Sequence, residues 1–103
     1  MTEERVKPAA CETMAEVRYG IDRLDEQIVA LIGERFRYMD AAARIKPHRD
    51  TVRVEWRKAQ VIENARSHAR AASVPDEVIG DIYERLVEGS IAYEFDRFDE
   101  LRG

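Results

Sequence analysis

The chain has 103 residues, of which 45% are hydrophobic and 37% charged, and its formal net charge is −4 at pH 7. This length predicts one domain, and the negative charge argues against a nucleic-acid binder because no basic face or arm stands out. Cys11 is the only cysteine, so an intrachain disulfide framework is excluded and a reducing compartment is expected.

No segment has the pattern of a targeting signal or a membrane span. Residues 1–10 contain no apolar core of signal-peptide length, and no later apolar run approaches the length of a span. We therefore expect a cytoplasmic protein that binds no membrane. Strand-like alternation, a glycine-rich phosphate loop, a metal-ligand cluster and internal repeats are also missing from the sequence, so the expected fold class is all-α, without a metal site.

The first twelve residues read as a leader to a long helix. Residues 1–12 are charged and contain a proline, and we expect them to be frayed. Thr13 and Glu16 have the spacing of a capping box, so the first helix should begin near Thr13. Pro47 disfavours helix at the residue before it, so this helix should end at Lys46.

One face of this helix carries an apolar stripe that is interrupted by one arginine. Apolar residues recur at alternating steps of three and four, the period of a helix face: Met14, Val17, Ile21, Leu24, Ile28 and Leu31. The next step falls on Arg35, whose guanidinium keeps its proton and is costly to bury alone. Either an acidic side chain on another helix neutralises Arg35, or the stripe lines a polar pocket in which Arg35 binds an anionic ligand.

The first helix is long for a chain of this size. Residues 13–46 would span roughly 50 Å at about 1.5 Å per residue, whereas a compact globule of this length is about 30–35 Å across. Part of the stripe must therefore lie beyond its own core, where another subunit is needed to cover it. We expect an intertwined homodimer in which the long helices pack together.

Two cations on this helix, Arg35 and Lys46, could act together. Arg35 and Lys46 lie within about 20° of the same helix face, about 16 Å apart along the axis, so two long side chains can lean towards one small anion. Arg18 lies about 100° around the helix from Arg35 and points into different surroundings.

A second helix is expected over about residues 54–72. Arg57 lies near its start, on the narrow apolar face, and Trp56 is expected to be a packing anchor. Ser73 follows as a plausible N-cap for the third helix.

The third helix is expected from about residue 75 to residue 98 or slightly beyond. Apolar residues surround Glu94 at helical spacing, and Ser90 lies one turn before it. Burial of a carboxyl group favours its neutral, proton-donating form. The alternative is that Glu94 pairs with Arg35 or Arg57 and only satisfies a buried charge.

The order and spacing of these residues resemble the all-helical (AroQ-type) chorismate mutase family, including the related isochorismate-pyruvate lyases. The first helix carries an Arg-x16-Arg-x10-Lys pattern, within which residues 17–25 (VRYGIDRLD) and 43–46 (ARIK) match. Arg57 opens the second helix as that family's arginine does. Residues 90–94 (SIAYE) resemble the family's Ser-x3-Gln/Glu signature.

The resemblance implies three helices in an intertwined homodimer, with residues 13–103 as the chorismate mutase-like domain. It also implies an enzyme of aromatic amino acid biosynthesis, the shikimate pathway, that rearranges chorismate to prephenate without a cofactor. This pericyclic (Claisen) reaction needs no nucleophile. It needs a cage that holds a dicarboxylate folded and donors aimed at the ether oxygen, which gains negative charge as its bond to carbon breaks.

By the family's pattern, four cations would line the site. Arg35 and Arg57 would bind the substrate carboxylates from one subunit, and Arg18 would reach in from the partner subunit. Lys46 would donate to the ether oxygen.

Two residues of the third helix would complete this site. Glu94 would be the second donor to the ether oxygen, which requires its protonated form, so activity should fall as the pH rises. Ser90 would be a lesser polar contact.

Two departures from the mutase pattern leave other functions open. Many mutases carry an acid at the position of Lys58, where it contacts the ring hydroxyl, and often an Asp at the position of Val54. Their absence favours the alternative of an isochorismate-pyruvate lyase, which gives salicylate and pyruvate. A further alternative is a non-catalytic helical module that interacts with or regulates another enzyme.

Overall fold

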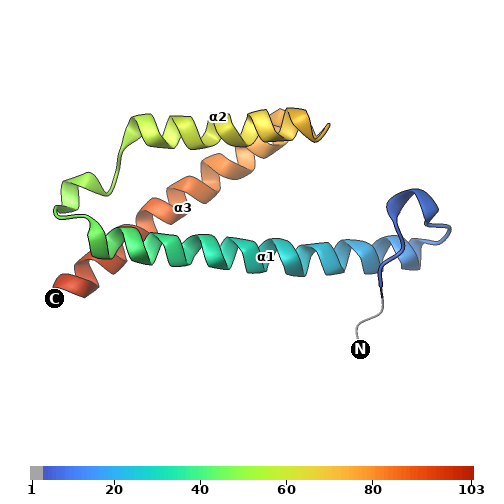
Figure 1. Cartoon of the computed structure of the whole chain (residues 1–103), viewed down its shortest axis with the longest axis horizontal. Helices are drawn as coiled ribbons and strands as arrows, with labels where there is room; N and C mark the ends of the chain where they lie inside the picture. The colour runs from blue at the N-terminus through green and yellow to red at the C-terminus, as the bar shows by residue number, and fades with distance from the viewer. Residues whose placement is uncertain (1–3) are drawn as a thin grey trace. The chain divides into compact units, whose positions relative to one another are not determined.

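The computed structural model describes residues 4–103, which are helical with no strand (Figure 1). The elements are two 3-10 turns and three α-helices: η1 (Pro8–Ala10), α1 (Met14–Ile45), η2 (Arg49–Thr51), α2 (Glu55–Ala71) and α3 (Asp76–Arg102). With 32 residues in α1, the prediction of three helices with a very long first one is confirmed. None of the helices in the described part of the chain combines the length and the apolar character needed to span a bilayer.

The chain divides into two compact units, residues 1–36 and 37–103, and the boundary falls within α1. In the first unit, the expected capping box is present at the start of α1. The Thr13 N–H donates to Glu16 Oε1 at 3.1 Å and the Glu16 N–H donates to Thr13 Oγ1 at 3.2 Å. The Glu12 N–H donates to the same carboxylate at 2.9 Å, and these bonds lower the pKa of Glu16 below its usual value.

Much of the apolar stripe on α1 is exposed in the single chain. Leu24 is 38% exposed, Ile28 51% and Leu31 65%, and Met14 and Ile21 are at least half exposed. A surface helix normally buries its apolar face against another element. The stripe therefore has the composition of a buried face, but the described chain leaves most of it in solvent.

In the second unit, α2 and α3 enclose a core together with the last turns of α1. The core residues come from α1, the connection after it, and α3: Ala43, Val52, Val87, Ile91 and Phe98. On α2, Ala65 and Ala69 are buried, as the narrow apolar face predicted. A Cβ atom added at Gly80 of α3 would lie 3.1 Å from Arg66 Cδ, so a small residue at this position allows the Arg66 side chain to lie against α3.

Ser73 does not cap α3, contrary to the sequence-based expectation. It has φ 58°, a left-handed conformation, and its N–H donates to Arg70 O at 3.2 Å. The Val74 N–H donates to Ala69 O at 2.9 Å, which completes a Schellman motif. Ser73 therefore ends α2, whereas the N-cap of α3 is Pro75, which makes no side-chain capping bond.

Asp76 ties the start of α3 to the end of α2. Its Oδ2 accepts from Arg66 Nη2 and from Arg70 Nη1, both at 2.9 Å. These arginines, Arg66 first, lower the pKa of Asp76 below its usual value. A carboxylate in the first turn is also favoured by the helix dipole.

Trp56 is 70% exposed, so its predicted role as a packing anchor is wrong for the single chain. Going from Trp56 to the buried Ala65 turns about 180° around α2, which puts the indole on the opposite side of the helix from the core.

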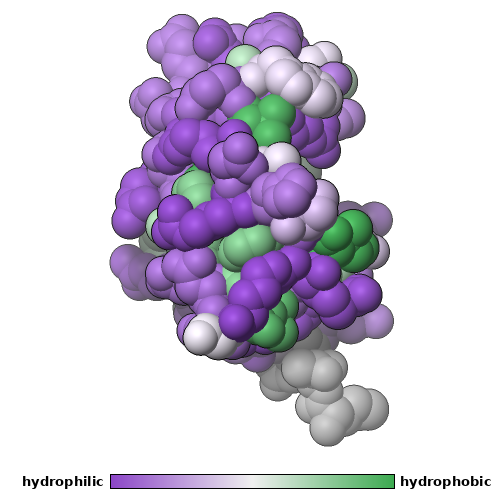
Figure 2. Space-filling view, turned by 90° about the vertical axis from the view of Figure 1, so that its left-hand side faces the viewer, coloured by the Kyte–Doolittle hydropathy of each residue, from purple (hydrophilic) through white to green (hydrophobic). Residues whose placement is uncertain are grey.

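The face shown in Figure 2 is mainly hydrophilic, and hydrophobic side chains occur there only in separate places.

Candidate active site

The end of α1 meets α3 through an ion pair in which the carboxylate is buried and the lysine side chain is partly exposed. Lys46 follows the last residue of α1, and its N–H still donates to Ala42 O at 2.9 Å. The Lys46 Nζ lies 2.7 Å from Glu94 Oε2, and Glu94 is 4% exposed. The same Nζ donates to Val52 O at 3.1 Å. The ammonium is therefore held at two points beside a buried carboxylate.

The cation at Glu94 is Lys46, whereas the spacing of residues suggested Arg35 or Arg57. The physical reason is the burial of Ala43, which is 0% exposed and brings the last turns of α1 into the core that includes α3. The charges are in contact at 2.7 Å, yet Glu94 Oε2 is not aligned for a hydrogen bond with any donor in the described chain. We therefore regard the contact as an ion pair in which the carboxylate retains hydrogen-bonding capacity.

Ser90 lies one turn before Glu94 and is 3% exposed. Its Oγ donates to Leu86 O at 2.7 Å, a bond of a serine hydroxyl to its own helix. Towards a ligand, Ser90 would therefore offer a lone pair as an acceptor.

The three predicted arginines are distributed over both units. Arg57, in the second unit, is exposed, and its Nη1 donates to Gln60 Oε1 at 2.7 Å. Arg18 is exposed and Arg35 half-buried, both on the part of α1 that belongs to the first unit. Of the predicted site residues, the structure brings Lys46 and Glu94 into contact.

Lys58 stands where many mutases carry an acid. Its ammonium forms salt bridges with acidic residues of α3. Its Nζ lies 2.7 Å from Glu84 Oε1 and 2.9 Å from Glu88 Oε2, and its side chain is 18% exposed. Arg53 Nη2 lies 2.8 Å from Glu88 Oε1. Hydrogen bonds from Arg53 and then from Lys58 lower the pKa of Glu88 to about 2.

Glu88→Gln is expected to remove an acid-sensitive part of the stability. Because the pKa of Glu88 falls from 4.5 to about 2 on folding, the carboxylate stabilises the fold above the unfolded pKa, and this contribution disappears as the pH falls through the folded pKa. In thermal unfolding from neutral pH down to about pH 2, the difference in Tm between the parent and Glu88→Gln should be largest near neutrality and vanish at the acid end. The control is Asp81→Asn, at an exposed residue of α3. A Tm difference for Glu88→Gln that persists unchanged near pH 2 would contradict this role.

Sequence reasoning did not identify a polar network that joins α1 to α3 beside Glu94. Tyr93 Oη donates to Asp40 Oδ1 at 2.7 Å, and Arg97 Nε donates to the same oxygen at 3.1 Å. The bond to Tyr93 lowers the pKa of Asp40, and the same bond raises the pKa of Tyr93. Because Tyr93 precedes Glu94, this network holds the register of α1 and α3 at the ion pair.

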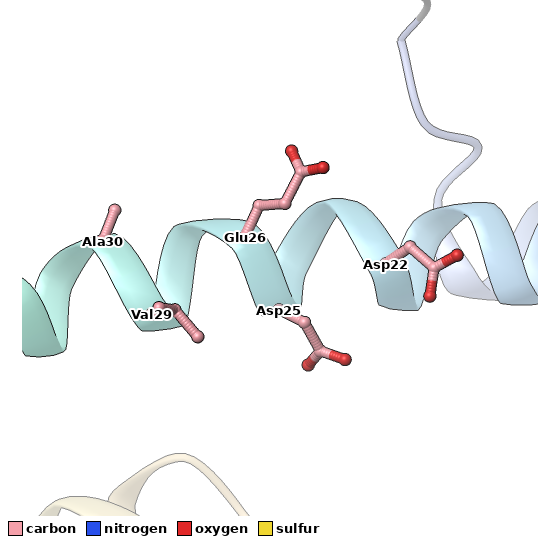
Figure 3. A pocket seen from close by; sticks show the side chains of 5 residues that line it. All are labelled: Asp22, Asp25, Glu26, Val29 and Ala30. Carbon is pink, nitrogen blue, oxygen red and sulfur yellow. The ribbon is translucent and has the colours of Figure 1, made fainter.

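A shallow hollow in the first unit carries acidic residues and is not a metal centre. It is lined by Asp22, Asp25, Glu26, Val29 and Ala30. Figure 3 shows the carboxyl groups of Asp25 and Glu26 on different sides of α1, and Arg23 Nη2 lies 2.7 Å from Glu26 Oε1. Within residues 4–103, no group of three or more His, Cys, Asp or Glu side chains is arranged to hold a metal ion.

Comparison with known families agrees with this arrangement. The family described as chorismate mutase type II matches residues 17–95. The chain belongs to this family. The matched region contains every predicted site residue, and the resemblance that the sequence motifs indicated is confirmed. Lys46 and Glu94 both lie within the matched residues. Both also belong to the motifs on which the resemblance was based.

One relative is named for the alternative activity, that of an isochorismate pyruvate lyase. The isochorismate pyruvate lyase of Pseudomonas aeruginosa is 25% identical to this chain over 96 residues, which cover 93% of this chain and 95% of that protein. The similarity therefore extends over nearly the whole length of both chains.

Proposed function

We propose that the protein is a chorismate mutase, which rearranges chorismate to prephenate without a cofactor. The observation that carries this proposal is the ion pair between Lys46 and the buried Glu94, with 2.7 Å between Nζ and Oε2, in a chain of the chorismate mutase family. A pericyclic rearrangement is accelerated by holding the substrate in a reactive shape and by donors at the oxygen that gains charge.

Lys46 and Glu94 are the two proposed donors to the ether oxygen. Lys46 donates as an ammonium, whereas Glu94 donates only when it carries a proton. In the ligand-free chain the two groups form an ion pair, with Lys46 Nζ 2.7 Å from Glu94 Oε2. Binding of the substrate oxygen between them therefore requires uptake of a proton by Glu94 and release of Lys46 from the carboxylate.

The arginines would bind the two substrate carboxylates. We assign Arg35 and Arg57 to this task in one subunit and Arg18 to the site of the partner subunit, because a guanidinium pairs with a carboxylate through two parallel hydrogen bonds. Ser90 would accept a hydrogen bond from the substrate.

A second copy of this chain is the proposed cover for the apolar stripe. The stripe on α1 includes Leu24, Ile28 and Leu31, which are 38%, 51% and 65% exposed, and contiguous apolar surface of this kind marks an interaction site. An identical helix would supply an identical apolar surface, which is the basis of a two-fold interface. Light scattering coupled to gel filtration would test this: a mass of twice 11.9 kDa is expected, and a monomer at working concentration would contradict it.

The second candidate function is cleavage of isochorismate to salicylate and pyruvate. The relative from Pseudomonas aeruginosa, named as an isochorismate pyruvate lyase, favours it. So does Lys58, which is paired with Glu84 and Glu88 at a position where mutases use an acid for the ring hydroxyl of chorismate. The two candidates share the fold of the family and much of its residue pattern.

The deciding experiment is separate incubation of the protein with chorismate and with isochorismate. Prephenate formed from chorismate at a rate proportional to enzyme supports the mutase. Salicylate and pyruvate formed in equal amounts from isochorismate, without prephenate from chorismate, would replace it with the lyase. If the protein converts neither substrate, the result supports the alternative of a non-catalytic helical module.

Arg35→Ala separates an enzyme from a helical interaction module. If Arg35 binds a substrate carboxylate, its loss should lower kcat/KM by at least about 100-fold, since a charged hydrogen-bonded pair is removed, while the variant stays folded. If Arg35 serves only an internal contact, the Tm falls and turnover by the folded fraction is retained. Arg85→Ala, at an exposed residue of α3, is the matched control.

A further inference from the structure

The carbonyl groups at the end of α1 lack donors from their own helix. Ala43 is 0% exposed, and the residue four positions after it is Pro47, which has no N–H to donate to the Ala43 carbonyl. Arg102 in the last turn of α3 supplies this donor, since its Nη1 lies 2.9 Å from Ala43 O. Its Nη2 donates to Lys46 O at 2.6 Å.

The guanidinium of Arg102, an exposed residue, stacks on an aromatic ring of the core. Its Cζ lies 3.6 Å from the centroid of the Phe98 ring, and Phe98 is a buried core residue. A planar guanidinium can stack on a ring and donate to two carbonyl oxygens at the same time, which an ammonium cannot do. The last turn of α3 thus clamps the last turn of α1.

This clamp acts on the residue whose ammonium meets Glu94. The Lys46 N–H donates to Ala42 O at 2.9 Å, its carbonyl accepts from Arg102, and its Nζ lies 2.7 Å from Glu94. Because the N–H and the carbonyl of Lys46 are both hydrogen-bonded, the position of its backbone, from which the side chain extends, is fixed.

The connection after α1 is held on α3 in a similar way. Arg49 Nε donates to Asp99 Oδ1 at 2.9 Å, and Arg49 Cζ lies 4.7 Å from the centroid of the Phe95 ring. This connection leads to Val52, which is 3% exposed and whose carbonyl accepts from Lys46 Nζ. The acceptor that orients the ammonium is therefore itself part of the packed core.

We propose that Arg102 is a positioning residue for Lys46. By supplying the donor that Pro47 removes from α1, Arg102 sets the point from which the Lys46 ammonium reaches the reacting oxygen of the substrate. The catalytic consequence rests on the proposed function. A displacement of about 1 Å in a group at the reacting atoms lowers a rate by roughly 100-fold, so a clamp on the backbone of Lys46 controls kcat although Arg102 acts only through Lys46.

The test compares Arg102→Ala, Arg102→Lys and the exposed control Arg85→Ala. For the proposal, Arg102→Ala lowers kcat by about 10- to 100-fold with KM nearly unchanged. Arg102→Lys recovers Tm, because it keeps a cation at the end of α1. It does not recover kcat, because one ammonium cannot replace the planar guanidinium that donates to two carbonyl groups. A role in stability alone predicts that kcat of the folded fraction is retained in both variants and that Lys rescues whatever is lost.

A second measurement does not depend on turnover. The NMR signal of the Lys46 ammonium, slowed in exchange by its bond to Val52 O and its contact with Glu94, should be visible in the parent and in Arg85→Ala and should broaden or vanish in Arg102→Ala. If the parent converts neither chorismate nor isochorismate, the proposed function fails while this signal still tests the positioning. An unchanged ammonium signal in Arg102→Ala overturns the positioning role, and so does an unchanged kcat. If Arg102→Ala does not fold, the same two measurements on Arg102→Lys decide.

Discussion

Lys46→Ala is expected to lower kcat/KM by about 100- to 1,000-fold, the usual effect of removing one donor from an oxyanion site. It should also destabilise the protein by about 1–3 kcal/mol, because a buried acceptor that loses its partner keeps the cost of its desolvation. The acceptor is Glu94, which is 4% exposed. Steady-state kinetics and urea unfolding measure the two effects on the same preparation.

The double variant Lys46→Ala/Glu94→Gln separates the two effects. Removing the charge of Glu94 should restore most of the lost stability, since no anion is left buried without its cation, but turnover should not return. Arg85→Ala is the control for the loss of an exposed cation. A Lys46→Ala variant with the kcat/KM of the parent would remove Lys46 from the mechanism.

Glu94→Gln is expected to retain activity and to flatten its dependence on pH. An amide N–H₂ donates at every pH, whereas a carboxyl group donates only when protonated. Once Glu94 ionises, each further pH unit reduces the protonated fraction about tenfold, so the parent should lose kcat/KM by about tenfold per unit on the alkaline side. The measurement is kcat/KM against pH for both proteins, with the Tm recorded at each pH.

Two results would contradict the donor role of Glu94. The first is loss of activity at every pH in Glu94→Gln with the fold intact, because an amide is then unable to replace the group. The second is an alkaline fall of the same slope in both proteins, because another residue then controls the pH dependence. Ser90→Ala serves as a comparison on the same helix, since its hydroxyl proton already bonds to Leu86 O and its change should leave the pH profile in place.

Local signals along the chain are sufficient to place the three helices and their approximate ends. The capping box at Thr13 and Glu16, the proline at residue 47 and the long stripe on α1 are local signals, because capping and helix periodicity depend on residues three to four positions apart. Local order also identified the family. Arg18, Arg35 and Lys46 lie along one helix, so their spacing can be recognised without knowing how the helices pack.

Which side chains from different helices come into contact depends on how the helices pack. Periodicity shows that Glu94 faces apolar neighbours, but its partner Lys46 comes from a segment 48 positions away, brought there by the burial of Ala43. Likewise, a basic residue at the end of α3 indicates only a favourable charge for its own helix, whereas Arg102 donates to the end of α1. The direction in which two helices cross is set by side-chain packing over the whole core, and no spacing along one helix contains that information.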